Sequence, residues 1–298
     1  MSGLAPTEQA AWVRVLVEGG SAQDRERALL AAVEAGASGG EERGGPQPAL
    51  VVYAPGARGP AVHGALRALP GPQRVGPLEV VPEQTWSEAW KEGLEPIAIS
   101  PRLVVTPSFR PVPARAGQRV LEIDPGQAFG TGGHASTRLA LELLAALPEE
   151  ALRGARALDV GCGTGVLALA ALALGAGEAV ALDLDPLATT ASRENARRNG
   201  LEGSLRVFNG PVASLCDEPF SLVLANMIRS ELFPVLPELA RRCAPGGLVV
   251  VSGLLLEEEE RAVEALGELG LGIAMRLDRS DHLGDHWLGA VAKGLESS

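Results

Sequence analysis

The sequence contains few aromatic and few cysteine residues. Aromatic residues make up 3% of its 298 residues, so Ala, Leu and Val have to fill the core. The three cysteines are Cys162, Cys216 and Cys243. Their odd number and wide spacing fit neither a disulfide framework nor a zinc site. We therefore expect reduced thiols, as in cytoplasmic proteins, and no metal site.

Targeting and membrane-spanning features are also missing. Residues 1–17 lack the basic start and long apolar run of a secretory signal. No uninterrupted apolar segment reaches the roughly 20 residues that span a bilayer. The net charge of −11 repels phosphate backbones, so nucleic acid is not the first partner to propose. These features predict a soluble cytoplasmic protein that acts on a basic protein or a small molecule, and not on a membrane.

The N-terminal region, residues 1–84, has the pattern of a small α/β module. Leu29, Leu30 and Val33 fall on one side of a predicted helix. A Gly/Pro-rich loop, 38–48, follows it, and no catalytic grouping is visible. The β-α-β-α-β order predicts a ferredoxin-like module, with strands at 12–17, 50–53 and 78–81 and helices at 24–37 and 61–69.

Residues 85–113 read as an ordered connector to a second domain, residues 114–298. Trp86 and Trp90 share one helical face, and repeated prolines then exclude a long helix. In the second domain, strands alternate with helices, which indicates a mainly parallel sheet. The last two strands are close together and predict an antiparallel hairpin at one edge. The predicted strands are 157–160, 179–183, 205–208, 221–225, 248–252, 273–277 and 286–292.

A glycine-rich turn follows the first of these strands, in the sequence ALDVGCGTG at 157–165. Ligands of open α/β sheets bind at the carboxyl ends of strands. The turn lacks the Lys of a phosphate-binding P-loop, and Val166 would crowd a dinucleotide pyrophosphate. A ligand without a diphosphate fits better, and S-adenosylmethionine is such a ligand. We therefore predict a Rossmann-like class I methyltransferase domain whose seven-stranded sheet ends in a reversed pair. The turn's cofactor-binding residues are Asp159, Gly161, Gly163 and Gly165.

Two later strand ends complete the predicted site. Asp183 ends the next strand, where a carboxylate can accept bonds from both ribose hydroxyls. Asp185, before Pro186, is predicted to cap a helix. Asn226 ends the fourth strand, and with the Met227 carbonyl it could hold an attacking amine in line with the methyl group. Asn226 and Met227 are therefore the predicted catalytic residues.

The segment from Asp124 to Thr137, DPGQAFGTGGHAST, resembles the DPGxAFGTGxHxTT motif of bacterial ribosomal protein L11 methyltransferases, the PrmA family. The resemblance covers about residues 85–298. It implies methylation of lysine and N-terminal amines of L11, with the N-terminal module recognising that protein. It also implies that Phe129 and its loop lie over the methionine end of the cofactor. Cofactor contacts are implied for Thr137, Gly161, Asp183 and Asn226.

Some positions depart from the family pattern or leave alternatives open. His134 is either a general base or a residue that orients the loop. Many methyltransferases have an Asp near the adenine, and Asn209 stands at that position here. Asn209 would then be the hydrogen-bond partner of the adenine. Alternative functions are methylation of another protein or a small molecule, and cofactor binding without turnover. A nucleic-acid base methyltransferase is disfavoured, because Met227-Ile228-Arg229 replaces the usual aromatic clamp after Asn226.

Overall fold

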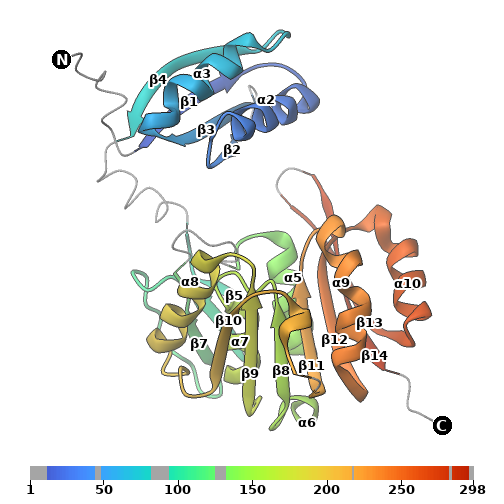
Figure 1. Ribbon diagram of the computed structural model, residues 1–298. Coiled ribbons are helices and arrows are strands. Elements are labelled where there is room, and N and C mark those ends of the chain that lie inside the picture. The colour runs from blue at the N-terminus through green and yellow to red at the C-terminus, as the bar shows by residue number, and fades with distance from the viewer. Residues whose placement is uncertain are drawn as a thin grey trace. The chain divides into compact units, whose positions relative to one another are not determined.

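The computed structural model describes residues 12–43, 48–81, 94–124, 132–216, 218–281 and 284–294. The chain divides into two compact units, residues 1–93 and residues 94–298 (Figure 1). No helix among the described residues is both long and apolar enough to cross a membrane. Trp86, Trp90 and Phe129 lie outside the described residues.

The first unit is an antiparallel sheet with two helices packed against it. The strand order is β2-β3-β1-β4. Strand β1 alternates between inward and outward residues, and Val13, Val15 and Val17 are buried beneath the helices. The elements are β1 (Trp12–Glu18), α2 (Ala22–Glu34), β2 (Gly39–Arg43), β3 (Ala49–Pro55), α3 (Gly59–Ala68) and β4 (Arg74–Val81).

Helix α2 and strand β2 depart from what the composition of their segments suggests. The sheet-facing side of α2 carries Ala28 and Ala32, whereas Leu30 and Val33 are 59% and 49% exposed. The small alanines let the helix approach the sheet closely, and this turns the larger residues outward. The predicted Gly/Pro-rich loop contains strand β2, which pairs with β3 along its whole length. Gly40 suits that strand, because a Cβ there would lie 2.8 Å from Leu29 Cδ1.

The second unit contains a seven-stranded sheet of order β10-β9-β8-β11-β12-β14-β13. Each of the seven predicted strands falls within an observed one. Strands β8 to β12 run parallel, and β14 is antiparallel to both of its neighbours. The strands are β8 (Arg156–Val160), β9 (Glu178–Asp183), β10 (Leu205–Asn209), β11 (Phe220–Asn226), β12 (Cys243–Leu255), β13 (Leu271–Ser280) and β14 (His286–Gly294).

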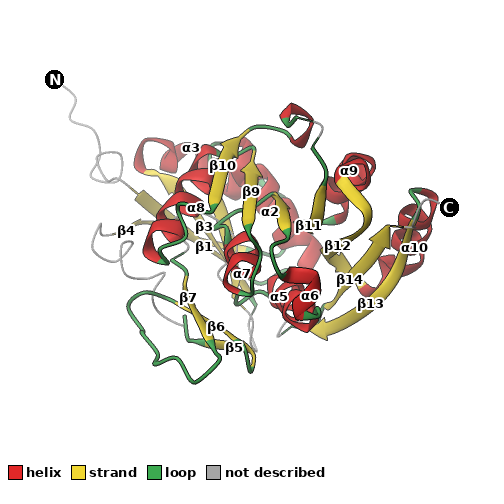
Figure 2. Ribbon diagram, turned by 90° about the horizontal axis from the view of Figure 1, so that it is seen from below, coloured by secondary structure: helices red, strands yellow, loops and turns green. Residues whose placement is uncertain are grey.

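Helices cover both faces of this sheet (Figure 2). The strands are therefore buried on both sides and read as nearly continuous apolar runs. In β8, Ala157 packs into one core and Leu158 into the other. The first core includes residues of α5 (Ala135–Ala146), α7 (Val166–Ala173) and α8 (Pro186–Arg198), and the second includes residues of α9 (Arg229–Arg242) and α10 (Glu259–Glu268).

A smaller sheet precedes the seven-stranded one. It consists of β5 (Ile97–Ser100), β6 (Leu103–Thr106) and β7 (Arg119–Glu122), in that order. Strands β5 and β6 lie within the segment interpreted as a connector. The prolines of that segment lie directly before β5, in the turn between β5 and β6, and in the β6–β7 loop, so they exclude a long helix but leave short strands intact.

Candidate cofactor and amine-binding site

Three neighbouring strands of the large sheet end at one edge and build a cleft there. Strands β9, β8 and β11 lie side by side and run parallel. The glycine-rich turn, Asp183 and Asn226 follow directly from their carboxyl ends. The cleft has a volume of about 830 Å³. This lies within the range of about 300–1,000 Å³ usual for small-molecule pockets. Its lining includes Thr137, Gly161, Cys162, Gly163, Asp183, Asn226 and Met227.

The glycine-rich turn needs glycine for its backbone conformation. Gly161, Gly163 and Gly165 have φ angles of +70°, +52° and +79°, in the left-handed region. The Gly161 and Cys162 N–H groups donate to Leu182 O at 2.9 and 3.1 Å, which ties the turn to β9. Gly165 does not line the cleft. A Cβ at that position would lie 3.0 Å from Ser192 Oγ, so its glycine serves the contact with α8.

Asp183 is held between the turn and the start of α8. Its Oδ2 accepts from Gly163 N at 2.9 Å and its Oδ1 from Asp185 N at 3.0 Å. A carboxylate offers about four lone-pair sites, so two remain for a ligand in the cleft. Asp185 caps α8 by accepting from Leu187 N at 2.8 Å, which confirms the predicted helix cap.

Asn226 is fixed through one end of its amide. Its Nδ2 donates to Thr137 Oγ1 at 3.0 Å. Its Oδ1 is buried and has no hydrogen-bond partner among the described residues. An unsatisfied buried acceptor is unfavourable, so this atom is suited to a donor that enters the cleft. Met227 follows it, with its N–H bonded to Ser252 O at 3.0 Å.

Asp159 and Asn209, like Gly165, lie apart from the cleft lining. Asp159 is 1% exposed, and its Oδ2 accepts from Ala168 N at 3.0 Å. Burial raises the pKa of the Asp159 carboxyl from 3.8 to about 7. Asp159 thus faces the first turn of α7. Asn209 Nδ2 donates to Asp183 O and Leu184 O, both at 3.0 Å, and so closes the β9–β10 edge.

His134 begins α5. Its Nδ1 lies 2.8 Å from Ser136 Oγ, and its ring meets Trp287 edge to face at 4.8 Å between centroids. It is absent from the cleft lining given by the described residues. His134 thus caps the N-terminus of α5, and its role in the site stays a prediction.

The charged residues that line the cleft are acidic: Asp183, Asp185 and Glu231. The lining formed by the described residues contains no Lys or Arg. Such a lining disfavours phosphates and suits a cationic ligand or substrate. Sequence reasoning missed Glu231, which lies in the first turn of α9. It also missed Ser192 and Asn195, which contact the turn from α8. The sequence feature that could have identified Ser192 and Asn195 is their spacing of three residues, which places both polar side chains on the buried side of the helix.

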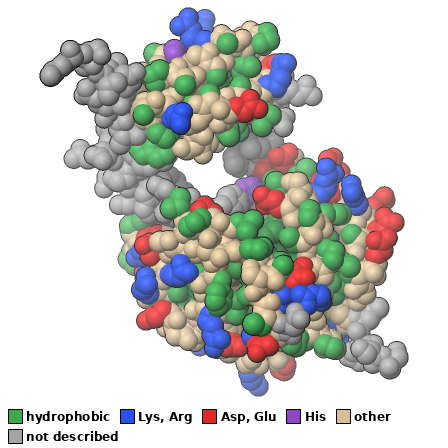
Figure 3. Space-filling view, in the orientation of Figure 1, with side chains coloured by type: hydrophobic (Ala, Val, Ile, Leu, Met, Phe, Trp, Pro, Cys, Tyr) green, Lys and Arg blue, Asp and Glu red, His purple; other side chains and the backbone are tan. Residues whose placement is uncertain are grey.

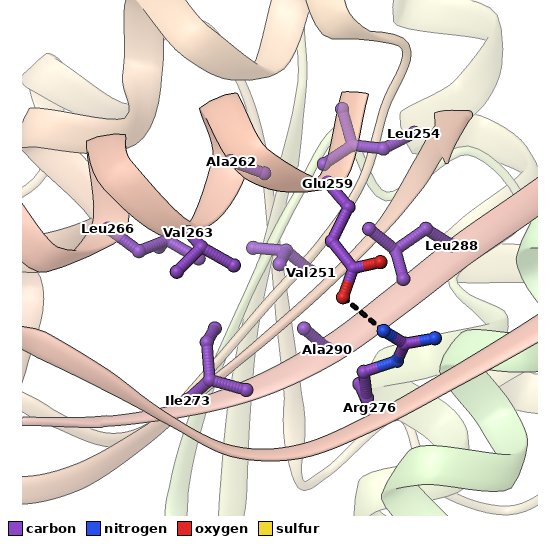
Figure 4. Close-up of a pocket in the computed structure, with 10 residues that line it drawn as sticks. All are labelled: Val251, Leu254, Glu259, Ala262, Val263, Leu266, Ile273, Arg276, Leu288 and Ala290. Carbon is purple, nitrogen blue, oxygen red and sulfur yellow. Dashed lines mark hydrogen bonds and ion pairs between the residues drawn. The ribbon is translucent and has the colours of Figure 1, made fainter. Parts of the chain in front are cut away.

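A second hollow lies between α10 and the β12–β14–β13 part of the sheet (Figure 4). Apolar residues such as Val251 and Leu266 line it, and the Glu259–Arg276 ion pair crosses its edge. Its volume is about 20 Å³. That is room for about one water molecule, so it is a packing gap and not a ligand site.

This chain is similar in sequence to known proteins. The family profile described as "Ribosomal protein L11 methyltransferase (PrmA)" matches residues 71–283. A ribosomal protein L11 methyltransferase of Pelotomaculum thermopropionicum is 42% identical over 211 residues, which cover 70% of this chain and 67% of that relative. One of Symbiobacterium thermophilum is 40% identical over 191 residues, covering 64% and 61%. The chain therefore aligns with about two thirds of these relatives' length.

A solved structure shares the fold of about two thirds of this chain. The crystal structure of ribosomal protein L11 methylase from Lactobacillus delbrueckii subsp. bulgaricus superimposes with a TM-score of 0.58 at 28% sequence identity. The match covers 68% of this chain and 100% of that one.

Proposed function

The chain belongs to the family of ribosomal protein L11 methyltransferases (PrmA), and from this we propose that it methylates lysine side chains and the N-terminal amine of ribosomal protein L11. The methyl donor in this proposal is S-adenosylmethionine. The observation that carries the proposal is the buried Asn226 Oδ1, which has no hydrogen-bond partner in the described part of the chain, in a cleft whose charged lining is acidic.

The residues of the cleft fit this cofactor. S-adenosylmethionine would supply an electrophilic methyl group on a cationic sulfur. Gly161 and Gly163 line the cleft, and a Cβ at Gly161 would collide with the Met227 side chain. Asp183 has lone pairs for the two ribose hydroxyls. Thr137 and Asn226 also line the cleft. Phe129 stays a proposed cofactor contact, whereas Asp159 and Gly165, which were predicted to bind the cofactor, would instead shape the turn.

Asn226 and Met227 would position the amine. A lysine amine has a pKa near 10.4 and must lose its proton before it attacks. An N–H of the neutral amine donates to Asn226 Oδ1, and the Met227 carbonyl offers a second acceptor. The Thr137 hydrogen bond holds the Asn226 amide in place during this step. The amine would release its proton to solvent before the transfer, the cofactor's sulfur would leave as a neutral thioether, and the methylated amine would release another proton before a second transfer. Holding the nitrogen lone pair in line would then supply most of the catalysis.

Glu231 would attract the substrate before it reaches Asn226. The neighbouring Arg229 is paired with Glu258 at 3.2 Å, so it does not neutralise Glu231 through an ion pair of its own. The ammonium form of the amine is drawn toward a cleft lined by carboxylates. We expect this attraction to lower KM for the protein substrate and to leave the methyl transfer itself unchanged.

The same proposal assigns substrate recognition to the N-terminal unit. The strand order β2-β3-β1-β4 with two helices supports a ferredoxin-like module at residues 1–84, followed by a connector at 85–113 and the methyltransferase domain at 114–298. Leu30 and Val33 form an exposed apolar pair on α2 that suits protein contact. We place the enzyme in the cytoplasm, with its substrate.

A nucleic-acid substrate is the weaker alternative. On the face of the second unit seen in Figure 3, acidic and basic side chains are interspersed, without the basic stripe that a phosphate backbone needs. The test is radiolabelled methyl transfer into the separated proteins and RNA of unmodified ribosomes. Label in L11 supports the proposal. Label in another protein, in RNA or in none of them contradicts it.

A further inference from the structure

Helix α8 turns polar side chains toward the protein interior. Thr189, Ser192 and Asn195 follow one another at intervals of three and are 2%, 0% and 1% exposed. A buried polar group is costly unless it is hydrogen-bonded. Thr189 Oγ1 donates to Pro186 O within its own helix. Ser192 and Asn195 have partners outside α8, and each has at least one partner in the cofactor turn.

The two side chains hold successive carbonyl groups of the turn. Ser192 Oγ donates to Gly163 O at 2.8 Å, and Asn195 Nδ2 donates to Thr164 O at 3.0 Å. Gly165 lets α8 come this close, since a Cβ there would meet Ser192 Oγ at 3.0 Å. The turn is thus held from α8 through its carbonyl groups and from β9 through its N–H groups.

Asn195 also holds the chain just beyond β7. Its Oδ1 accepts from Asp124 N, and its Nδ2 donates to Asp124 O, both at 3.0 Å. With the Thr164 bond, both amide protons of Asn195 are used. One side chain therefore joins three segments: α8, the cofactor turn and the end of the smaller sheet.

Asn199, one helical turn later, makes the same kind of pairing without reaching the cofactor turn. Its Oδ1 accepts from Glu122 N at 2.9 Å, and its Nδ2 donates to Glu122 O at 2.8 Å. Its Nδ2 also donates to Asn195 O within α8. Asn195 and Asn199 thus form hydrogen bonds with the backbone at the end of β7, as a neighbouring strand would. They differ in the second bond of the amide nitrogen, which Asn195 donates to Thr164 O of the turn and Asn199 donates to Asn195 O within α8.

We propose that Asn195, supported by Ser192, is a positioning residue that sets the affinity for S-adenosylmethionine by fixing the carbonyl side of the turn at 161–165. This inference rests on the proposed function, because it takes the turn to be the cofactor site. Asn195→Asp replaces a donor with an acceptor that faces the oxygens of Thr164 and Asp124. The resulting repulsion displaces the turn and therefore weakens cofactor binding.

The test compares Asn195→Asp with Asn199→Asp in the full-length protein. Thermal unfolding without cofactor measures the shared loss of the β7 pairing, and calorimetric titration with S-adenosylmethionine measures Kd. We expect a similar fall in Tm for both variants. Loss of a buried hydrogen bond predicts a rise in Kd of about tenfold for Asn195→Asp and less than about twofold for Asn199→Asp.

Hydrogen exchange of the cofactor-free protein gives a readout that is independent of activity. Asn195→Asp should speed exchange of the Gly163 and Gly165 amides, whereas Asn199→Asp should leave them near the wild-type rate. If Asn195→Asp does not fold, Ser192→Ala replaces it, with a rise in Kd of about threefold expected and Thr189→Ala as its control.

The outcomes separate the inference from the proposed function. Equal Kd values for wild type and Asn195→Asp would overturn the positioning role, and so would an equal rise in both Asn variants. Failure of the wild-type protein to bind S-adenosylmethionine would instead contradict the proposed function, and the inference with it.

Discussion

Replacing Asp183 with alanine should weaken binding of S-adenosylmethionine while the protein still folds. The substitution removes two proposed bonds to ribose hydroxyls and the two observed bonds that Gly163 N and Asp185 N donate to the Asp183 carboxylate. Hydrogen bonds to charged groups contribute about 1.5–3 kcal/mol each. Part of this is recovered by water, so we expect a loss of about 2–3 kcal/mol, which corresponds to a roughly 30- to 150-fold higher Kd.

Asp185→Ala is the matched control. It removes the same charge from the same cleft lining. It also removes the bond to Leu187 N that caps α8, a loss of about 1 kcal/mol in stability. Calorimetric titration of both variants, with unfolding followed in parallel, separates the two effects. We expect Asp185→Ala to raise Kd by no more than about threefold while lowering Tm.

The ribose role for Asp183 is refuted by either of two results. One is an unchanged Kd in Asp183→Ala. The other is an equal rise in both variants, which would mean that the cleft senses only its total negative charge. A binding comparison with 2′-deoxy and 3′-deoxy cofactor analogues adds a second check. The wild-type protein should discriminate against both analogues, and Asp183→Ala should not.

Three further predictions concern the amine, the substrate and the buried carboxyl. Asn226→Ala should lower kcat at least about a hundredfold in methyl-transfer assays; a near-normal kcat would exclude the positioning role. Glu231→Gln should raise KM for the protein substrate several-fold at low salt with little change in kcat, and the effect should fade at high salt; a changed kcat with unchanged KM would contradict this. Because the pKa of Asp159 is raised, the folded state binds the carboxyl proton more tightly than the unfolded state does. The contribution of Asp159 to the free energy of unfolding is therefore fully present below pH 3.8 and is lost as the pH rises to about 7. Asp159→Asn should therefore gain Tm relative to the wild type across this range, and parallel Tm curves for the two proteins would show that Asp159 does not titrate there.

The parts of the molecule that local sequence determines were predictable. The turn at 161–165 combines an apolar strand, glycines with positive φ and a following helix, all of which are adjacent in the chain. The Asp185 cap with Pro186 behind it is likewise a local signal. Strands that are buried on both faces appear in the sequence as long apolar runs. These runs indicated where the strands of the second unit lie along the chain.

The parts that were missed depend on contacts between distant segments. Strand β2 has a loop-like composition and forms because β3 pairs with it. Helix α2 packs against the sheet through Ala28 and Ala32, although Leu30 and Val33 are more apolar. Asn195 reads as a solvent-facing residue of a polar helix, and only the approach of Thr164 and Asp124 gives it buried partners.

The most direct test of the central claim is intact-mass analysis of purified ribosomal protein L11 after incubation with the enzyme and S-adenosylmethionine. We predict a series of mass increments of one methyl group each, which peptide mapping assigns to lysine side chains and the N-terminal amine. Asn226→Ala, which retains the cofactor turn, should give no such series under the same conditions. Unmodified L11 after incubation with a wild-type protein that binds the cofactor would contradict the account.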